Sequence, residues 1–173
     1  MAGAPVYGVS LACRVMTPDS PLPDEQRAAM AVAPRAAMVA VMSAADSSRV
    51  GLAKEALAAK KVIEAGETSD NPLVADACKV NVETGLAGLD AATIREHALI
   101  RLYDASKILD ELPVDDAAGF RAWVMECCDS VANAAKSGGG GLFRKKGAEA
   151  VTEAERVRIG EVSESLAGRP PAE

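Results

Sequence analysis

Alanine is the residue type that most limits how this chain can fold. It occupies 35 of the 173 positions, whereas only five residues are aromatic. Alanine has the strongest preference for helix, and β-sheets depend on β-branched and aromatic side chains for their packing. The composition therefore predicts an all-α protein. A chain of this length suits one hydrophobic core, so we expect a single compact bundle of five or six helices.

Prolines and glycines mark the boundaries of this predicted bundle. Residues 1–24 are expected to form an extended N-terminal lead-in, because three prolines between positions 17 and 25 oppose a regular helix. The helical domain is predicted over 25–168 and a short tail over 169–173. Four consecutive glycines within 136–147 also oppose helix, since glycine loses the most backbone entropy on ordering. We therefore expect a flexible Gly-rich loop there, before the last helix.

Start and stop signals divide the domain into individual helices. Pro34 is expected to interrupt the first apolar stretch and to begin a new helix. The next helix is predicted over about 49–65, with Val50 and Leu57 at helical intervals and Gly66 as its stop. Later helix starts carry capping residues, which are Asn71 with Pro72, Asp90, Asp115, and Thr152 with Glu155 as a capping box.

The helix that follows Asp90 is expected to be the longest and to lie at the centre of the bundle. Leu99, Ile100 and Tyr103 lie off its main apolar stripe, so its middle is apolar on two sides. The stripe itself comprises Ile94, Ala98, Leu102, Ala105, Leu109 and Leu112. In the next helix Trp123 flanks a second core stripe, made of Phe120, Val124, Cys127, Val131 and Ala134.

Charge and hydropathy exclude several classes of protein. The formal net charge is −6, whereas a general nucleic-acid binder needs a basic face that neutralises phosphates. No stretch approaches the roughly 20 apolar residues that span a bilayer. Residues 1–16 lack the basic start of a signal peptide, and the four cysteines show no CxxC spacing. We therefore expect a cytoplasmic protein that does not bind nucleic acid.

The sequence offers no complete set of catalytic or cofactor-binding residues. His97 is the only histidine, so the paired Glu-x-x-His motifs of a di-iron bundle are missing and a zinc site would need scattered thiols. Lys136 and Ser137 precede the four glycines, whereas the phosphate-binding loop motif places Lys and Ser or Thr after them. We therefore predict no catalytic residue and no cofactor.

Cys127 and Cys128 are candidate redox residues, since a thiolate near basic groups oxidises easily. Their neighbours Glu126 and Asp129 are acidic, and like charge raises the pKa of a thiol. Burial in the core is therefore the expected role of the two cysteines, with thiol redox sensing as an alternative.

The predicted Gly-rich loop carries a basic and apolar patch in an otherwise acidic chain. Leu142 and Phe143 lie among its basic residues, which are Lys136, Arg144, Lys145 and Lys146. Such a patch suits an acidic protein partner or an anionic membrane surface. The alternative is a solvated linker whose apolar residues fix the loop to the bundle.

Two segments about 90 residues apart share a pattern. Residues 41–47 (VMSAADS) and 131–137 (VANAAKS) agree at the valine, both alanines and the final serine. Each precedes a valine and a glutamate of the next helix, namely Val50 with Glu55 and Val151 with Glu155. An internal helix–turn–helix duplication would explain the match.

This arrangement resembles the tellurite-resistance TerB-like helical domains, in which Ala-Ala-Asp-Gly-x-Val/Ile turns lead into helices that begin with acidic residues. The resemblance covers about Ala33 to Ala167. It implies a compact helical bundle without established catalysis, used in bacterial stress or tellurite-related assemblies. It also implies that Asp46 and Glu55, which map onto the motif, contact a metal or a partner.

The leading hypothesis is a non-enzymatic cytoplasmic interaction protein with a stress-related role. It follows from a packed bundle that lacks a nucleophile, a base and an orienting group in any recognisable pattern. One alternative is a small-ligand-binding protein or enzyme whose pocket is assembled from dispersed residues, and another is the thiol redox sensor.

Overall fold

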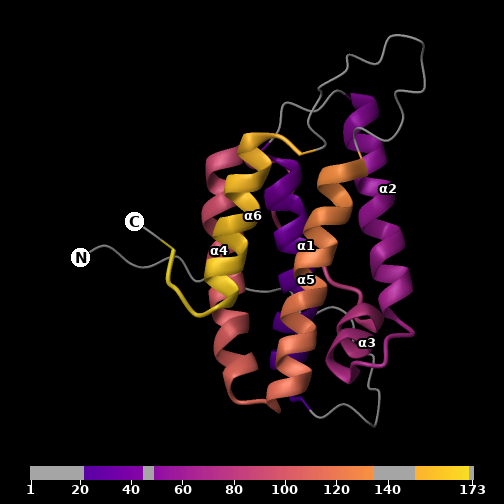
Figure 1. The fold of residues 1–173 in the computed structure, drawn as a ribbon, viewed down its shortest axis with the longest axis vertical. Coiled ribbons are helices and arrows are strands. Elements are labelled where there is room, and N and C mark those ends of the chain that lie inside the picture. The colour runs from indigo at the N-terminus through magenta and orange to yellow at the C-terminus, as the bar shows by residue number, and fades with distance from the viewer. Residues whose placement is uncertain (1–21, 45–48, 135–150, 172–173) are drawn as a thin grey trace.

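The computed structural model describes residues 22–44, 49–134 and 151–171. Over these ranges the chain is a bundle of six helices with no strand, so the predicted fold class and helix number are confirmed (Figure 1). The predicted loop 136–147 lies outside the described residues. The helices are α1 (Asp24–Met42), α2 (Arg49–Gly66), α3 (Pro72–Lys79), α4 (Ala91–Asp110), α5 (Val114–Ala134) and α6 (Glu153–Leu166).

The central helix of the bundle is α1. Both α1 and α5 pack against all the other helices, but α1 buries more residues than α4 or α5 does. The sequence predicts α4 at the centre, and this prediction is wrong. Ile100 on α4 is 42% exposed, and with 20 residues α4 is also shorter than α5, which has 21. Small side chains let neighbouring helices approach α1 on several sides, and its fully buried alanines are Ala31, Ala33, Ala36, Ala37 and Ala40.

The predicted core stripes of α4 and α5 are buried in the structure. Leu112 and Ala134, at the ends of the two stripes, are half-buried, and the other members are buried. Trp123 flanks the α5 stripe as expected and packs against Phe120, with the ring centroids 5.7 Å apart. Periodicity therefore identifies the inner faces of these two helices correctly.

The prediction of a helix break at Pro34 is wrong. α1 runs unbroken from Asp24 to Met42 with Pro34 in its interior. A proline there removes one backbone hydrogen bond and crowds the preceding turn, at a cost of roughly 3 kcal/mol. Pro34 is itself buried, and the packing of the central helix on all sides offsets this cost.

Capping residues begin three helices as predicted. The side chains of Asn71 and Asp90 each accept two backbone hydrogen bonds, at the starts of α3 and α4. Thr152 and Glu155 form the reciprocal hydrogen bonds of a capping box at the start of α6. α5 begins at Val114, so Asp115 lies in its first turn instead of capping it. An acidic side chain is favourable at either position because of the helix dipole, and the sequence signal does not distinguish the two.

At the edge of the bundle, α2 packs mainly against α5 and only slightly against α1 (Figure 1). Its buried residues are Gly51, Glu55 and Gly66. Val50 and Leu57 recur at helical intervals but face solvent, so this spacing does not mark an inner face. The alanines of α2 lie on several sides of the helix, and the spacing of its apolar residues therefore does not show which side is buried.

Candidate functional site

Three large apolar side chains are exposed on the first half of α2. Val50 is 65% exposed, Leu57 is 52% exposed and Leu52 is 48% exposed. Ala53 and Ala56 are exposed beside them. These five exposed residues lie within eight positions of one helix. A concentration of exposed apolar side chains is typical of an interaction site.

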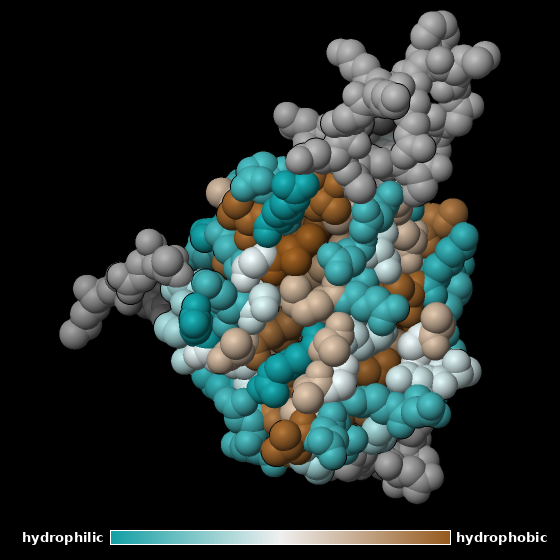
Figure 2. Space-filling model, viewed as in Figure 1, coloured by the Kyte–Doolittle hydropathy of each residue, from teal (hydrophilic) through white to brown (hydrophobic). Residues whose placement is uncertain are grey.

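Exposed apolar side chains are more scattered elsewhere in the described part of the chain. Figure 2 shows apolar surface broken up by polar side chains over α4, α5 and α6. The four other large exposed apolar residues come from separate places, and they are Leu89, Ile100, Val114 and Val157. Their concentration on α2 therefore distinguishes this helix.

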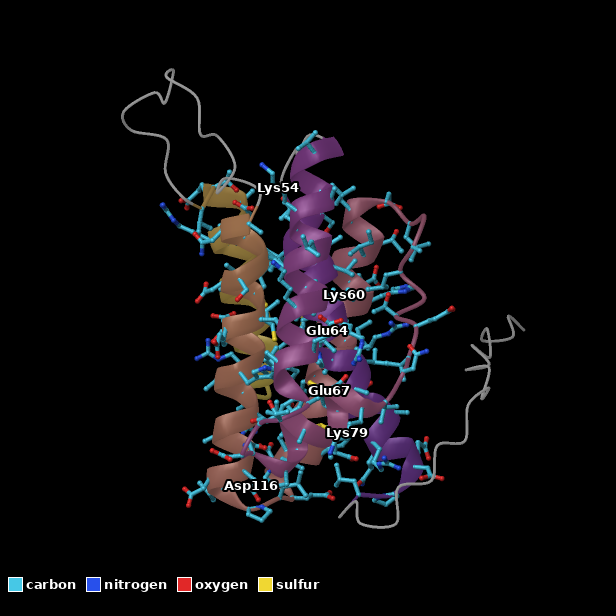
Figure 3. The ribbon with its side chains drawn as sticks, turned by 90° about the vertical axis from the view of Figure 1, so that its right-hand side faces the viewer. Lys54, Lys60, Glu64, Glu67, Lys79 and Asp116 are labelled. Carbon is cyan, nitrogen blue, oxygen red and sulfur yellow. The ribbon has the colours of Figure 1, made fainter. Side chains whose placement is uncertain are left out.

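The apolar surface of α2 is accompanied by positive charge. Lys54 lies among the apolar residues, Lys60 and Lys61 lie about one turn beyond them, and Glu55 is the only acidic residue between positions 50 and 61. Glu55 is only 1% exposed, so it contributes no charge to the outer surface. Figure 3 turns this side toward the viewer, with Lys54 and Lys60 along the helix. We call the three lysines and the five exposed apolar residues the α2 face.

A groove of about 490 Å³ lies beside the α2 face, between α1, α2 and α3. It exists because α2 packs on α5 and α3 and makes little contact with α1. Arg35, Lys60, Glu64, Glu67 and Lys79 supply charge at its walls and rim. Its apolar floor is formed by Met38, Val39, Met42, Ala59, Ile63 and Val80. We call this cavity the α1–α2 groove.

Arg35 is held in place by backbone carbonyls at one end of the groove. Its Nη1 donates hydrogen bonds to the carbonyl oxygens of Ala31 at 2.6 Å and Ala77 at 3.2 Å. Its Nη2 donates to the carbonyl oxygen of Val80 at 3.2 Å. Burial lowers the pKa of the guanidinium, while Cys78 raises it. The contacts tie the end of α3 to α1 and fix the guanidinium beside the groove.

The predicted burial of Cys127 and Cys128 is confirmed. Both side chains are fully buried, and neither forms a disulfide. Burial is the largest cause of their raised pKa values, which for Cys128 reaches about 12, and the acidic neighbours Glu126 and Asp129 add to it. A thiol in this setting stays protonated and inaccessible, and the geometry therefore gives no support to redox sensing.

Cys78 lines the groove and is also buried. Burial raises the pKa of its thiol to about 11, against the opposing effect of the Arg35 guanidinium. The sequence does not single out Cys78 as a site residue, because nothing in its local spacing places it beside a guanidinium 43 positions away.

Most of the other predicted site residues lie outside the described part of the chain. Asp46 falls between α1 and α2, and the basic residues Lys136, Arg144, Lys145 and Lys146 fall between α5 and α6. Glu55 is described and is buried on the inner side of α2. Within the described ranges, no three His, Cys, Asp or Glu side chains are grouped so that they could hold a metal ion.

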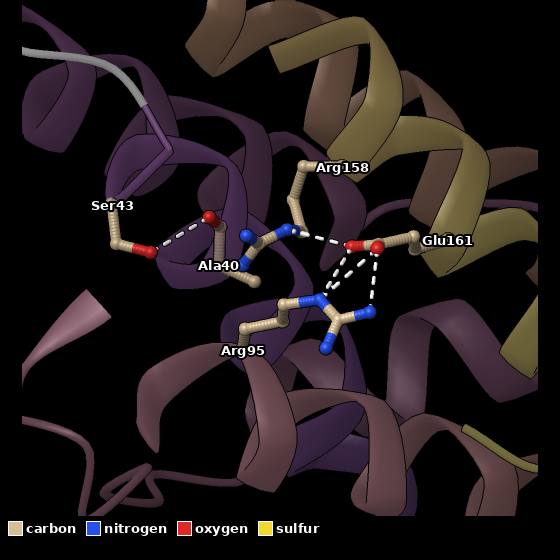
Figure 4. Close-up of polar contacts among 5 residues, drawn as sticks. All are labelled: Ala40, Ser43, Arg95, Arg158 and Glu161. Carbon is tan, nitrogen blue, oxygen red and sulfur yellow. Dashed lines mark hydrogen bonds and ion pairs between the residues drawn. The ribbon is translucent and has the colours of Figure 1, made fainter. Parts of the chain in front are cut away.

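Glu161 on α6 joins two arginines in a cluster that the sequence does not predict (Figure 4). Arg95 on α4 donates from Nε to both carboxylate oxygens at 3.0 Å and from Nη2 to one of them at 2.7 Å. Arg158 lies with its Nε 2.9 Å from the same carboxylate. The hydrogen bonds from Arg95 lower the pKa of Glu161, whereas burial lowers the pKa of Arg158. The cluster fastens α6 to α4.

Within the described ranges, each helix is too short or too polar to span a lipid bilayer. Comparison with known proteins adds no relative, since no family model, no curated protein and no solved structure matches the chain. The geometry of the α2 face and the groove therefore carries the functional argument.

Proposed function

We propose that this chain is a non-enzymatic interaction protein that binds an acidic amphipathic helix of a partner protein along the α2 face. The observation that carries the proposal is that Val50, Leu52 and Leu57, all about half or more exposed, lie on α2 close to Lys54 and Lys61, while Lys60 is paired with Glu64 at 3.5 Å. An amphipathic helix is commonly recognised by such a surface, because its apolar side meets the apolar residues and its polar side meets the surrounding charge.

Charge complementarity indicates that the partner surface is negatively charged. The outer surface of α2 is positive between residues 50 and 61, although the chain as a whole carries a net charge of −6. Acidic side chains at the edges of the partner helix would lie near Lys54 and Lys61, which raises the association rate and disfavours basic competitors.

The apolar residues supply most of the binding free energy in this proposal. Burying a Val or Leu side chain fully contributes roughly 1.5 to 3 kcal/mol. Three such side chains give an upper limit of several kcal/mol before the entropy lost on association is subtracted. The proposal therefore describes a reversible contact rather than an obligate one.

The proposed compartment is the cytoplasm. It is supported by the three described cysteines, Cys78, Cys127 and Cys128, all of which are free thiols, as expected in a reducing environment. The stress-related role implied by the resemblance to TerB-like domains remains part of the proposal.

A defined peptide tests the function. The probe is a synthetic amphipathic helix of about 18 residues with leucines on one side and glutamates on the other, long enough to form a stable helix on binding. We expect it to bind the wild type and to bind Val50→Ser/Leu57→Ser at least about tenfold more weakly, a difference of roughly 1.4 kcal/mol. The matched control is Val114→Ser/Val157→Ser, which changes exposed valines on α5 and α6 and should bind as the wild type does.

Two further arms give results that would overturn the proposal. A charge-reversed peptide with lysines in place of glutamates should bind much more weakly, and equal binding would show that the lysines of α2 do not select the partner. Binding to anionic vesicles without binding to the acidic peptide would assign the α2 face to a lipid surface instead.

A further inference from the structure

We propose that the α1–α2 groove is a binding site for an aliphatic monocarboxylate. The hydrocarbon chain of the ligand would lie on the apolar floor, and its carboxylate would lie between Arg35 and Lys79. This site lies beside the α2 face and shares only Lys60 with it, and it does not depend on the partner helix proposed above. The inference starts from the charges at one end of the groove.

Arg35 and Lys79 line the groove, and neither has a carboxylate partner in the described structure. This is unusual among the described arginines. Most of the others pair with an acid, as Arg27 does with Asp76 at 2.9 Å and Arg121 with Asp110 at 2.6 Å. Arg35 is half-buried, and a partly desolvated guanidinium binds an arriving carboxylate more strongly than a fully hydrated one does.

The guanidinium of Arg35 retains hydrogen-bonding capacity on one edge. Its three hydrogen bonds use Nη1 twice and Nη2 once, and its Nε–H makes none within the described structure. A guanidinium carries a further N–H on Nη2 beside the one on Nε, so this edge can donate two parallel bonds to one carboxylate. The backbone contacts to Ala77 and Val80 hold the group in place, which reduces the entropy lost on binding.

The floor and volume of the groove suit a flexible aliphatic chain. About 490 Å³ lies within the range of roughly 300 to 1,000 Å³ that small-molecule sites occupy. Met38 and Met42 contribute unbranched, adaptable side chains, and Ile63 and Val80 complete an apolar surface.

Two carboxylates that line the groove restrict the charge of the ligand. Glu64 on α2 and Glu67 just after its end line the groove, and only Glu64 has a lysine partner in the described structure, with Lys60 at 3.5 Å. Figure 3 shows Glu64 on α2, Glu67 just beyond the end of this helix, and Lys79 near Glu67. A second anionic group on the ligand would approach these carboxylates, so a single negative charge is favoured over a dicarboxylate or a phosphate.

The test uses decanoate below its micelle concentration as the probe, with decanol and decylammonium as partners of equal chain length and different charge. We expect decanoate to bind the full chain at least about tenfold more tightly than decanol, and decylammonium to bind no better than decanol. Methionines labelled with ¹³C in their methyl groups report the location by NMR. The signals of Met38 and Met42 should shift with decanoate, while those of Met30 and Met125, which do not line the groove, should stay in place.

Variants separate the contribution of the basic side chains to binding from that of the apolar cavity. Arg35→Gln should reduce the preference for decanoate over decanol to near unity, and Lys79→Ala should reduce it severalfold. Lys61→Ala is the matched control, because Lys61 is exposed on α2 and does not line the groove. If Arg35→Gln does not fold, Lys79→Ala and the methionine shifts still decide the matter.

Three results would overturn the proposal. Decanoate and decanol could bind equally, decanoate could leave the Met38 and Met42 signals unmoved, or a folded Arg35→Gln could keep the full preference. Each of these leaves the peptide titration on the α2 face unaffected, so the two proposals fail separately.

Discussion

Gly66 at the end of α2 lies directly against Cys78 of α3, so closely that a Cβ atom on Gly66 would overlap the Cys78 sulfur. The same Cβ would also lie 3.0 Å from Cζ2 of Trp123 on α5. The sequence predicts Gly66 as a helix stop, and α2 does end there. Its backbone is not in the left-handed region, however, so the residue is needed for space and not for its conformational freedom.

We therefore expect Gly66→Ala to destabilise the protein by about 1 to 3 kcal/mol through overpacking, measured as a shift of the urea midpoint. The matched control is Gly160→Ala on α6, where an added Cβ meets no atom within 4 Å. That variant should gain about 0.5 to 1 kcal/mol from better helix propensity. Adding Cys78→Ala to Gly66→Ala should restore part of the lost stability, and the absence of any rescue would contradict the contact.

A second prediction compares two residues of α4. Leu102 is fully buried, whereas Ile100 is 42% exposed. Leu102→Ala should cost about 2 to 4 kcal/mol, because it loses buried apolar contact and leaves a cavity. Ile100→Ala should cost less than about 1 kcal/mol, since its position is largely solvated. Equal shifts of the two urea midpoints would place the inner face of α4 elsewhere.

Local signals account for the parts of the fold that the sequence predicts well. Asn71, Asp90 and Thr152 cap helices through bonds to residues two or three positions away, so their role is readable from neighbours alone. Pro34 shows the limit of such signals, because the packing around α1 depends on helices distant in the sequence.

The candidate site depends on contacts between residues that are distant in the sequence. Arg35 reaches carbonyls of Ala77 and Val80, which lie 42 and 45 positions away, and the groove exists only because α2 stands away from α1. The sequence holds every residue of this site, but nothing in their spacing brings them together. The sequence also does not reveal which apolar side of α2 is exposed, since an alanine-rich helix has no single apolar stripe.

The third prediction concerns the buried thiols. At pH 8, iodoacetamide should modify Cys127 and Cys128 at least about tenfold more slowly in the folded protein than in urea, because burial raises their pKa and blocks access. Cys78, whose thiol pKa is raised to about 11, should also be protected. Mass spectrometry of tryptic peptides assigns the modified residues. Rapid native modification of Cys127 or Cys128 would contradict their burial and restore the redox alternative.

The last prediction is a pH dependence of stability that originates at Glu161. Hydrogen bonds from Arg95 lower the pKa of its carboxylate in the folded state. The unfolded state therefore binds a proton at higher pH than the folded state does, and folding is favoured while the carboxylate is ionised. This stabilisation is fully present above the ordinary glutamate pKa of about 4.3 and is lost as the pH falls through the lower folded value.

Replacing Glu161 by Gln should thus destabilise the protein by about 1.5 to 3 kcal/mol at pH 7, the usual range for hydrogen bonds to a charged group. The difference from the wild type should shrink steadily below pH 4, which urea denaturation at a series of pH values measures. Glu164→Gln is the matched control on the same helix, because the Glu164–Arg169 pair is largely exposed and contributes little. A stability difference for Glu161→Gln that stays constant down to pH 2 would show that packing of the side chain, and not its charge, fastens α6 to α4.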